Sequence, residues 1–144
     1  MKRLSVSHKF ARSADGATAV EFAMIAPVFV AFMLGMTAYG IYFGAAHSVQ
    51  QLSADAARVA LAGMNETERK NLVQDYVKKN SGDYLFLRTD AITASVSANN
   101  ADPSQSNVSV SYDARLLPIW NLYPPLPLPG QTISRTSTIR IGGI

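Results

Sequence analysis

Glu21 is the side chain whose type and position most suggest chemistry. It follows Gly16 by five residues and directly precedes Phe22, where a long segment without charged side chains begins. A carboxylate near the hydrocarbon boundary of a membrane is costly, or takes up a proton, unless a counter-charge lies close by. We therefore expect that Glu21 either pairs with a cation or lies in the headgroup region, where the start of a helix favours negative charge.

Other reactive side chains are not arranged for catalysis. His8 and His47 have no acid and nucleophile at a spacing that suggests a triad. The chain has no cysteine, which excludes thiolate nucleophiles, disulfides and zinc-thiolate sites. The downstream aspartates lack the spacing of an EF-hand or a zinc site. The sequence therefore predicts a protein that is not an enzyme, without catalytic residues, metal, cofactor or small-molecule substrate.

The net charge of +3 lies entirely within residues 1–16, because the rest of the chain holds equal numbers of basic and acidic residues. A basic surface spread over a fold would suggest a nucleic-acid partner. Here the basic leader comes immediately before an apolar segment, and this order keeps an N-terminus in the cytoplasm. We expect a membrane as partner, and no nucleic acid.

Residues 22–46 carry no charge. As a helix they would rise roughly 37 Å, enough to cross a hydrocarbon core of about 30 Å. Tyr39, Tyr42 and Phe43 cluster toward one end, as aromatic side chains do at membrane interfaces. A helix that is apolar on every face is unusual in a small globular core. We predict a transmembrane helix over residues 17–46.

A secretory signal peptide is a competing interpretation of this segment. Such a peptide has a shorter apolar part, about 7–15 residues, with a small-residue cleavage site after it. Here the small residues Gly16 and Ala17 come before the apolar part. Cleavage between them would remove the basic leader and keep the helix.

This order of parts resembles a type IV prepilin signal, and in detail the TadE/TadF family of pseudopilins that accompany tight-adherence (Flp) pili. The resemblance covers residues 12–62 well, and beyond them it is architectural only. The residues that carry it are Gly16, Ala17, Glu21 and Phe22, the apolar run with Pro27, and the later Asp55-Ala56-Ala57-Arg58.

The resemblance implies that a membrane-embedded aspartic prepilin peptidase cuts between Gly16 and Ala17, so that Ala17 becomes the first mature residue. The new α-amine, on a neighbouring subunit, would then supply the counter-charge that Glu21 needs. Such pairing between staggered parallel helices would set their axial register. We therefore expect Glu21 and Phe22 to act in recognition and assembly, with other pilin or pseudopilin subunits and inner-membrane pilus assembly proteins as partners.

Residues 47–144 are predicted to form an α+β head outside the cytoplasm. Apolar residues at helical spacing extend the membrane helix as an amphipathic helix over residues 47–62. Asn65 and Glu68 resemble a capping box that opens a second helix, residues 66–79. Alternating apolar and hydroxyl side chains within residues 90–141 predict a small antiparallel sheet of about three strands, whose apolar face the helices cover.

A proline-rich segment, residues 116–130, interrupts this predicted sheet. It contains five prolines and the only tryptophan, and it has no charge, so we predict a loop. It could be an ordered apolar loop folded over an open side of the sheet. It could instead be a docking patch for another pilin subunit or the outer leaflet, because exposed apolar patches on small domains usually mark contacts. The patch residues would be Ile119, Trp120, Leu122 and Tyr123.

Together these patterns predict a TadE-like pseudopilin or minor pilin in the bacterial inner membrane. It would span the membrane once, with a periplasmic head, and act in assembly of a Flp-type pilus or a related secretion machine. The alternative is an unprocessed single-pass protein whose periplasmic head senses or binds the envelope. A mature chain that begins at Ala17 favours the first hypothesis, and a retained Met1 favours the second.

Overall fold

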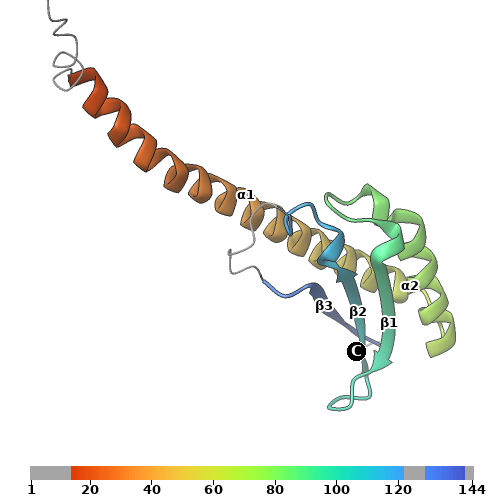
Figure 1. Cartoon of the computed structure of the whole chain (residues 1–144). Coiled ribbons are helices and arrows are strands. Elements are labelled where there is room, and N and C mark those ends of the chain that lie inside the picture. Colours follow the sequence, from red (N-terminus) through yellow and green to blue (C-terminus); the bar gives the residue numbers. More distant parts are fainter. Residues whose placement is uncertain (1–13, 122–128, 142–144) are drawn as a thin grey trace, which may run out of the picture. The chain divides into compact units, whose positions relative to one another are not determined.

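The structure is a computed structural model (Figure 1). It describes residues 14–121 and 129–141. Its helices are α1 (Ala14–Ala60) and α2 (Glu66–Asn80), and its strands are β1 (Ile92–Ala98), β2 (Gln105–Asp113) and β3 (Thr132–Arg140). Short 3-10 helices lie at Ser81–Asp83, Thr89–Ala91 and Ala114–Leu116. These elements confirm the predicted α+β class. The chain divides into two compact units, Met1–Thr37 and Ala38–Ile144.

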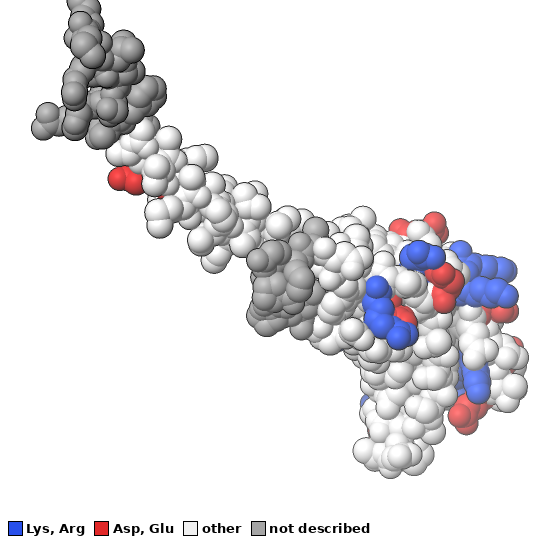
Figure 2. Space-filling view, viewed as in Figure 1, with Lys and Arg blue, Asp and Glu red and all other residues white. Residues whose placement is uncertain are grey.

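The described part of the first unit is the beginning of α1. Its large apolar side chains are exposed; that of Phe22, for example, is 72% exposed. On the face drawn in Figure 2, charged atoms gather over the second unit, and this segment of α1 is almost entirely white. By length and composition α1 is long and apolar enough to cross a membrane. The most apolar stretch of this helix is not buried inside the protein.

In the second unit, α1 packs against the sheet through small side chains. Ala38, Ala45, Ala56 and Ala60 are fully buried. Val49 and Leu52 are the larger α1 side chains that are fully buried with them. Ser53 is buried on the same part of α1, and its hydroxyl donates to the Val108 carbonyl oxygen at 3.3 Å and lies 2.9 Å from the Ser137 Oγ. The buried Ser53 hydroxyl therefore has hydrogen-bond partners.

The sheet has the strand order β1-β2-β3, and both pairs are antiparallel. Val108, Val110 and Tyr112 of β2 alternate with half-buried polar residues and are themselves buried. The register places Val96 opposite Val108, and Ile133 opposite Tyr112, so that the inward residues of all three strands share one face. This alternation is the period-two pattern that the sequence predicts.

Local chemistry sets the start of α2. The Asn65 Oδ1 accepts a hydrogen bond from the Glu68 backbone N at 2.9 Å, as the capping pattern predicts. The Glu68 carboxylate accepts in return from the Met64 N at 2.8 Å, one residue earlier than in a standard capping box. Gly63 is required here, because a Cβ at this position would lie 2.8 Å from the Arg69 backbone N.

Candidate functional site

The expected cleavage site lies at the beginning of α1. Gly16 and Ala17 are the third and fourth residues of this helix, and both are exposed. Neither residue is covered by the rest of the described chain.

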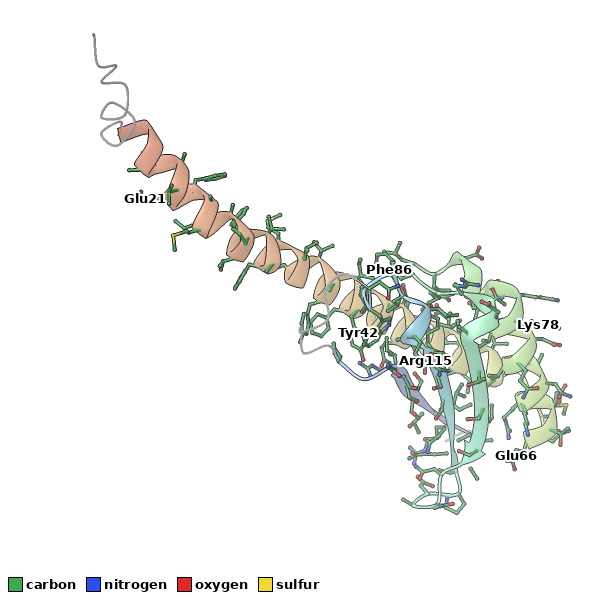
Figure 3. The ribbon with its side chains drawn as sticks, viewed as in Figure 1. Glu21, Tyr42, Glu66, Lys78, Phe86 and Arg115 are labelled. Atoms are coloured by element: carbon green, nitrogen blue, oxygen red, sulfur yellow. The ribbon has the colours of Figure 1, made fainter. Side chains whose placement is uncertain are left out.

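Glu21 and Phe22 follow on the same helix, and both side chains are exposed. Figure 3 labels Glu21 on this part of α1. Among the described residues, Glu21 takes part in none of the three ion pairs and in no side-chain hydrogen bond. Its carboxylate is thus free to accept a cation from outside the chain. Phe22 is equally free to contact lipid or another helix.

The end of the predicted transmembrane segment is packed inside the second unit. Of residues 38–46, Ala38, Ala45 and Ala46 are buried there, and Ile41 and Tyr42 pack against the same core. Side chains that face a protein core cannot face lipid. This leaves residues 16–37 as the uncovered apolar part of α1. Their length as a helix, roughly 33 Å, still matches a hydrocarbon core of about 30 Å.

The Asp55-to-Arg58 motif has a specific role in the second unit. The Arg58 Nη1 donates to the Asp55 Oδ1 at 3.0 Å, and the Tyr84 hydroxyl donates to the Asp55 Oδ2 at 2.8 Å. The Tyr84 and Tyr76 hydroxyl oxygens lie 3.2 Å apart. Asp55 therefore joins α1 to the segment that follows α2, and through Tyr76 to α2 itself.

Burial raises the pKa of the Tyr84 hydroxyl above its ordinary value, and the hydrogen bonds with Tyr76 and Asp55 raise this pKa further. Tyr84 therefore remains protonated at physiological pH and can donate to the carboxylate. A hollow of about 510 Å³ opens beside this cluster, lined by His47, Asp55 and Tyr84 among others. Among the described residues no three His, Asp or Glu side chains are grouped to hold a metal ion. The cluster therefore has a structural role: its hydrogen bonds connect α1 with α2 and with the segment that follows α2.

The expected docking patch is only partly described. Ile119 is fully buried, so the expectation that it is exposed is wrong. Trp120 is half-buried, and its indole Nε1 donates to the Ala114 carbonyl oxygen at 2.6 Å. The other two patch residues, Leu122 and Tyr123, lie outside the described residues.

The physical reason for the burial of Ile119 is that residues 114–121 fold back onto the end of the sheet. Ala114 and Leu117 are buried in the same core as Ile119. This short segment thus behaves as the ordered apolar loop that the sequence allowed as the other interpretation. Burial of its apolar side chains is favourable because it removes them from water.

Two tyrosines of the second unit form hydrogen bonds that the sequence did not predict. Tyr84 binds Asp55 from 29 positions further along the chain, and Tyr42 donates its hydroxyl hydrogen to the Gly130 carbonyl oxygen at 3.1 Å. Asp55 itself indicated the contact with Tyr84, because it is a carboxylate on a helix face that otherwise faces the core. No local sequence pattern identifies Tyr84 as the partner of Asp55.

Comparison with known proteins gave a match in the first part of the chain. Residues 16–58 match the family described as TadE-like protein. The matched segment begins at Gly16 and ends at Arg58, so it contains the expected cleavage site, Glu21 and the Asp55–Arg58 pair. Searches of curated proteins and of solved structures gave no significant match. The match confirms the resemblance predicted from the sequence: over residues 16–58 the chain is similar to the TadE-like family.

Proposed function

We propose that this chain is a pseudopilin or minor pilin that acts in assembly of a Flp-type pilus or a related secretion machine. The observation that carries the proposal is the TadE-like match over residues 16–58. The match includes a free carboxylate, Glu21, in a helix whose apolar side chains are uncovered from Gly16 to Thr37. A role as a structural subunit, and not as an enzyme, agrees with this family.

The proposed location is the bacterial inner membrane. Residues 17–37 cross the bilayer, the basic leader stays in the cytoplasm, and residues 38–144 form a periplasmic head. Two observations support this orientation: the excess positive charge lies in residues 1–16, and the apolar segment directly follows it.

In the proposed maturation step, a prepilin peptidase hydrolyses the Gly16–Ala17 bond. The products are a leader with a new carboxylate and a mature chain whose N-terminus is the α-amine of Ala17. Ala17 and Glu21 are four residues apart, which is about 6 Å along a helix. If the amine of one subunit pairs with Glu21 of its neighbour, the two parallel helices are offset by about one helical turn. The pairing satisfies two groups that are each unfavourable in lipid.

Replacement of Glu21 tests this assembly step. Glu21→Val removes the carboxylate from an exposed position, so the protein should still insert in the membrane but fail to co-purify with other pilin subunits. The matched control is Ile25→Val, another change at an exposed position of the same helix that removes no charge. Co-purification and pilus formation by Glu21→Val at the level of the Ile25→Val control would refute the pairing.

A further inference from the structure

A turn in the second unit exposes two large apolar side chains. The turn is closed by a hydrogen bond from the Leu87 N to the Tyr84 carbonyl oxygen at 3.2 Å, which leaves Leu85 and Phe86 at its tip. Leu85 is 66% exposed and Phe86 is 39% exposed. Phe86 also has a φ of 64°, a left-handed conformation that bulky side chains rarely adopt. Glycine or asparagine would suit this position better, and a polar tip would suit water better.

The fold nevertheless holds Phe86 in place. Its carbonyl oxygen accepts a hydrogen bond from the Tyr112 hydroxyl at 3.0 Å. Its ring lies against Gly44 of α1, so closely that a Cβ at Gly44 would be 2.8 Å from a ring carbon. The turn is thus fixed beside the part of α1 that begins the second unit. A strained conformation that is held by several contacts is a reason to look for a function of Phe86.

Two further exposed side chains lie at the same end of the second unit. Leu116, 46% exposed, follows Tyr112 by four residues, and Phe43, 62% exposed, precedes Gly44. Figure 3 shows Tyr42 and Phe86 at this end, and Glu66 of α2 well away from them. We name the set Phe43, Leu85, Phe86 and Leu116 the apolar rim.

Two ion pairs border the apolar rim. The Arg88 Nη2 lies 2.8 Å from the Asp90 Oδ2, just after the turn, and the Arg115 Nη2 lies 2.5 Å from the Asp113 Oδ2, just before Leu116. Each guanidinium is therefore already paired with a carboxylate of its own loop. Asp83, two residues before Leu85, is exposed and takes part in none of the three ion pairs among the described residues. The four side chains of the apolar rim are themselves uncharged.

We propose that the apolar rim inserts into the interfacial layer of the bilayer that α1 crosses. Chain connectivity supports this partner, because Ala38 of the second unit directly follows the uncovered apolar segment 16–37 in one continuous helix. The aromatic rings of α1 also mark this level: Tyr39 and Tyr42 lie 6.0 and 6.1 Å from Phe43, measured between ring centroids, and such clusters concentrate at membrane interfaces. The inference rests on the membrane anchoring in the proposed function, but not on processing or pilus assembly.

The absence of cysteine from the chain allows a direct test with single-cysteine variants of the full-length protein. Leu85→Cys and Leu116→Cys place an environment-sensitive fluorophore on the rim. Met64→Cys, 88% exposed and beyond the end of α1, is the matched control. The proteins are reconstituted in phosphatidylcholine vesicles that contain a lipid spin-labelled near its headgroup. Both rim probes should show blue-shifted emission and strong quenching by the spin label, and the Met64→Cys probe should show neither.

The outcomes separate the inference from the proposed function. Rim probes that report water in protein that floats with the vesicles would overturn the inference and leave anchoring intact. Protein that fails to float would overturn both. A blue shift that appears only at a high ratio of protein to lipid would assign the rim to a second copy of the chain, and also overturn the inference.

A second variant tests the role of the strained residue. Phe86→Asn keeps a side chain that tolerates the left-handed conformation but removes the ring. The head should unfold at the same urea concentration as wild type in detergent, while quenching of the probe at Leu116→Cys decreases. Unchanged quenching in the Phe86→Asn background would contradict a role for Phe86 in lipid contact.

Discussion

The two parts of α1 use opposite kinds of side chain for the same helical backbone. From Gly16 to Thr37 the helix presents phenylalanine, methionine, isoleucine and valine to its surroundings, and these side chains are more than half exposed. From Ala38 to Ala60 its buried positions are mainly alanines, with Val49 and Leu52. Bulky apolar side chains suit a lipid environment, whereas small ones allow close packing against a sheet.

The comparison shows that apolar content alone does not mark where a membrane segment ends. Residues 38–46 are as free of charge as the residues before them, yet Ala38, Ala45 and Ala46 are covered by protein. What differs is which side chains are covered: in the packed part the buried positions are mostly small, and in the uncovered part the large side chains are exposed. Matched substitutions in the two parts test this difference.

The largest expected effect is that of removing a large side chain from the packed part. Leu52→Ala should lower the free energy of unfolding of the head by about 2–5 kcal/mol, because it leaves a cavity in the core. Met36→Ala removes a side chain that is 67% exposed and should leave this free energy unchanged. Urea titration in detergent, followed by Trp120 fluorescence, measures both. Equal midpoints for the two variants would contradict the division of α1.

The converse substitution, from small to large, should have the next largest effect. Ala56 is fully buried, so Ala56→Leu should overpack the interface between α1 and the sheet and cost about 1–3 kcal/mol. Ala31 is exposed, and Ala31→Leu should be tolerated. The same urea titration compares the two variants. A stable Ala56→Leu protein would show that alanine is not required for close packing here.

A smaller effect is expected at the Asp55 cluster. Tyr84→Phe removes the hydrogen bond to the carboxylate and should destabilise the head by roughly 1–2 kcal/mol, since the site is only partly buried. Tyr76→Phe is the control, because it keeps the bond between Tyr84 and Asp55 and should cost less. Thermal unfolding of both variants gives the order. A larger loss in Tyr76→Phe would reverse the assignment of Asp55 as the centre of the cluster.

The smallest expected effect is a pH dependence at an exposed ion pair. Hydrogen bonds from Arg115 lower the pKa of Asp113 from 3.8 to about 2. Because the pKa is depressed in the folded state, the contribution of the pair to stability is fully present above pH 3.8 and is lost as the pH falls through about 2. NMR titration of the Asp113 carboxyl carbon checks this pKa.

The control for this titration is Arg115→Gln. Removal of the guanidinium should return the pKa of Asp113 toward 3.8, and the stability of the head should change little because the Arg115 side chain is exposed and Asp113 is only half-buried. A wild-type Asp113 that already titrates at 3.8 would show that the pair does not persist in solution.

The parts of the fold that depend on local sequence were predictable. Asn65 and Glu68 are three residues apart, and Val108, Val110 and Tyr112 alternate along one strand, so a short window contains the whole signal. The start of α2 and the inward face of β2 follow from such patterns alone. The apolar length of α1 was equally visible.

The contacts between distant segments were not predictable in the same way. Tyr42 and Gly130 are 88 positions apart, and nothing in either neighbourhood specifies the other. The composition of residues 116–130 showed an apolar loop, but composition does not determine whether Ile119 points inward or outward. Its burial depends on the open end of the sheet, which exists only once the three strands have assembled.

The mature N-terminus of the protein decides whether Glu21 has a new amine to pair with. The wild-type protein is extracted from membranes of its native host, with and without an active prepilin peptidase, and its intact mass is measured. We expect a chain that begins at Ala17 when the peptidase is active, and a chain that keeps residues 1–16 when it is not. A chain that keeps residues 1–16 in both strains would contradict processing and, with it, the pairing of Glu21 with a new amine.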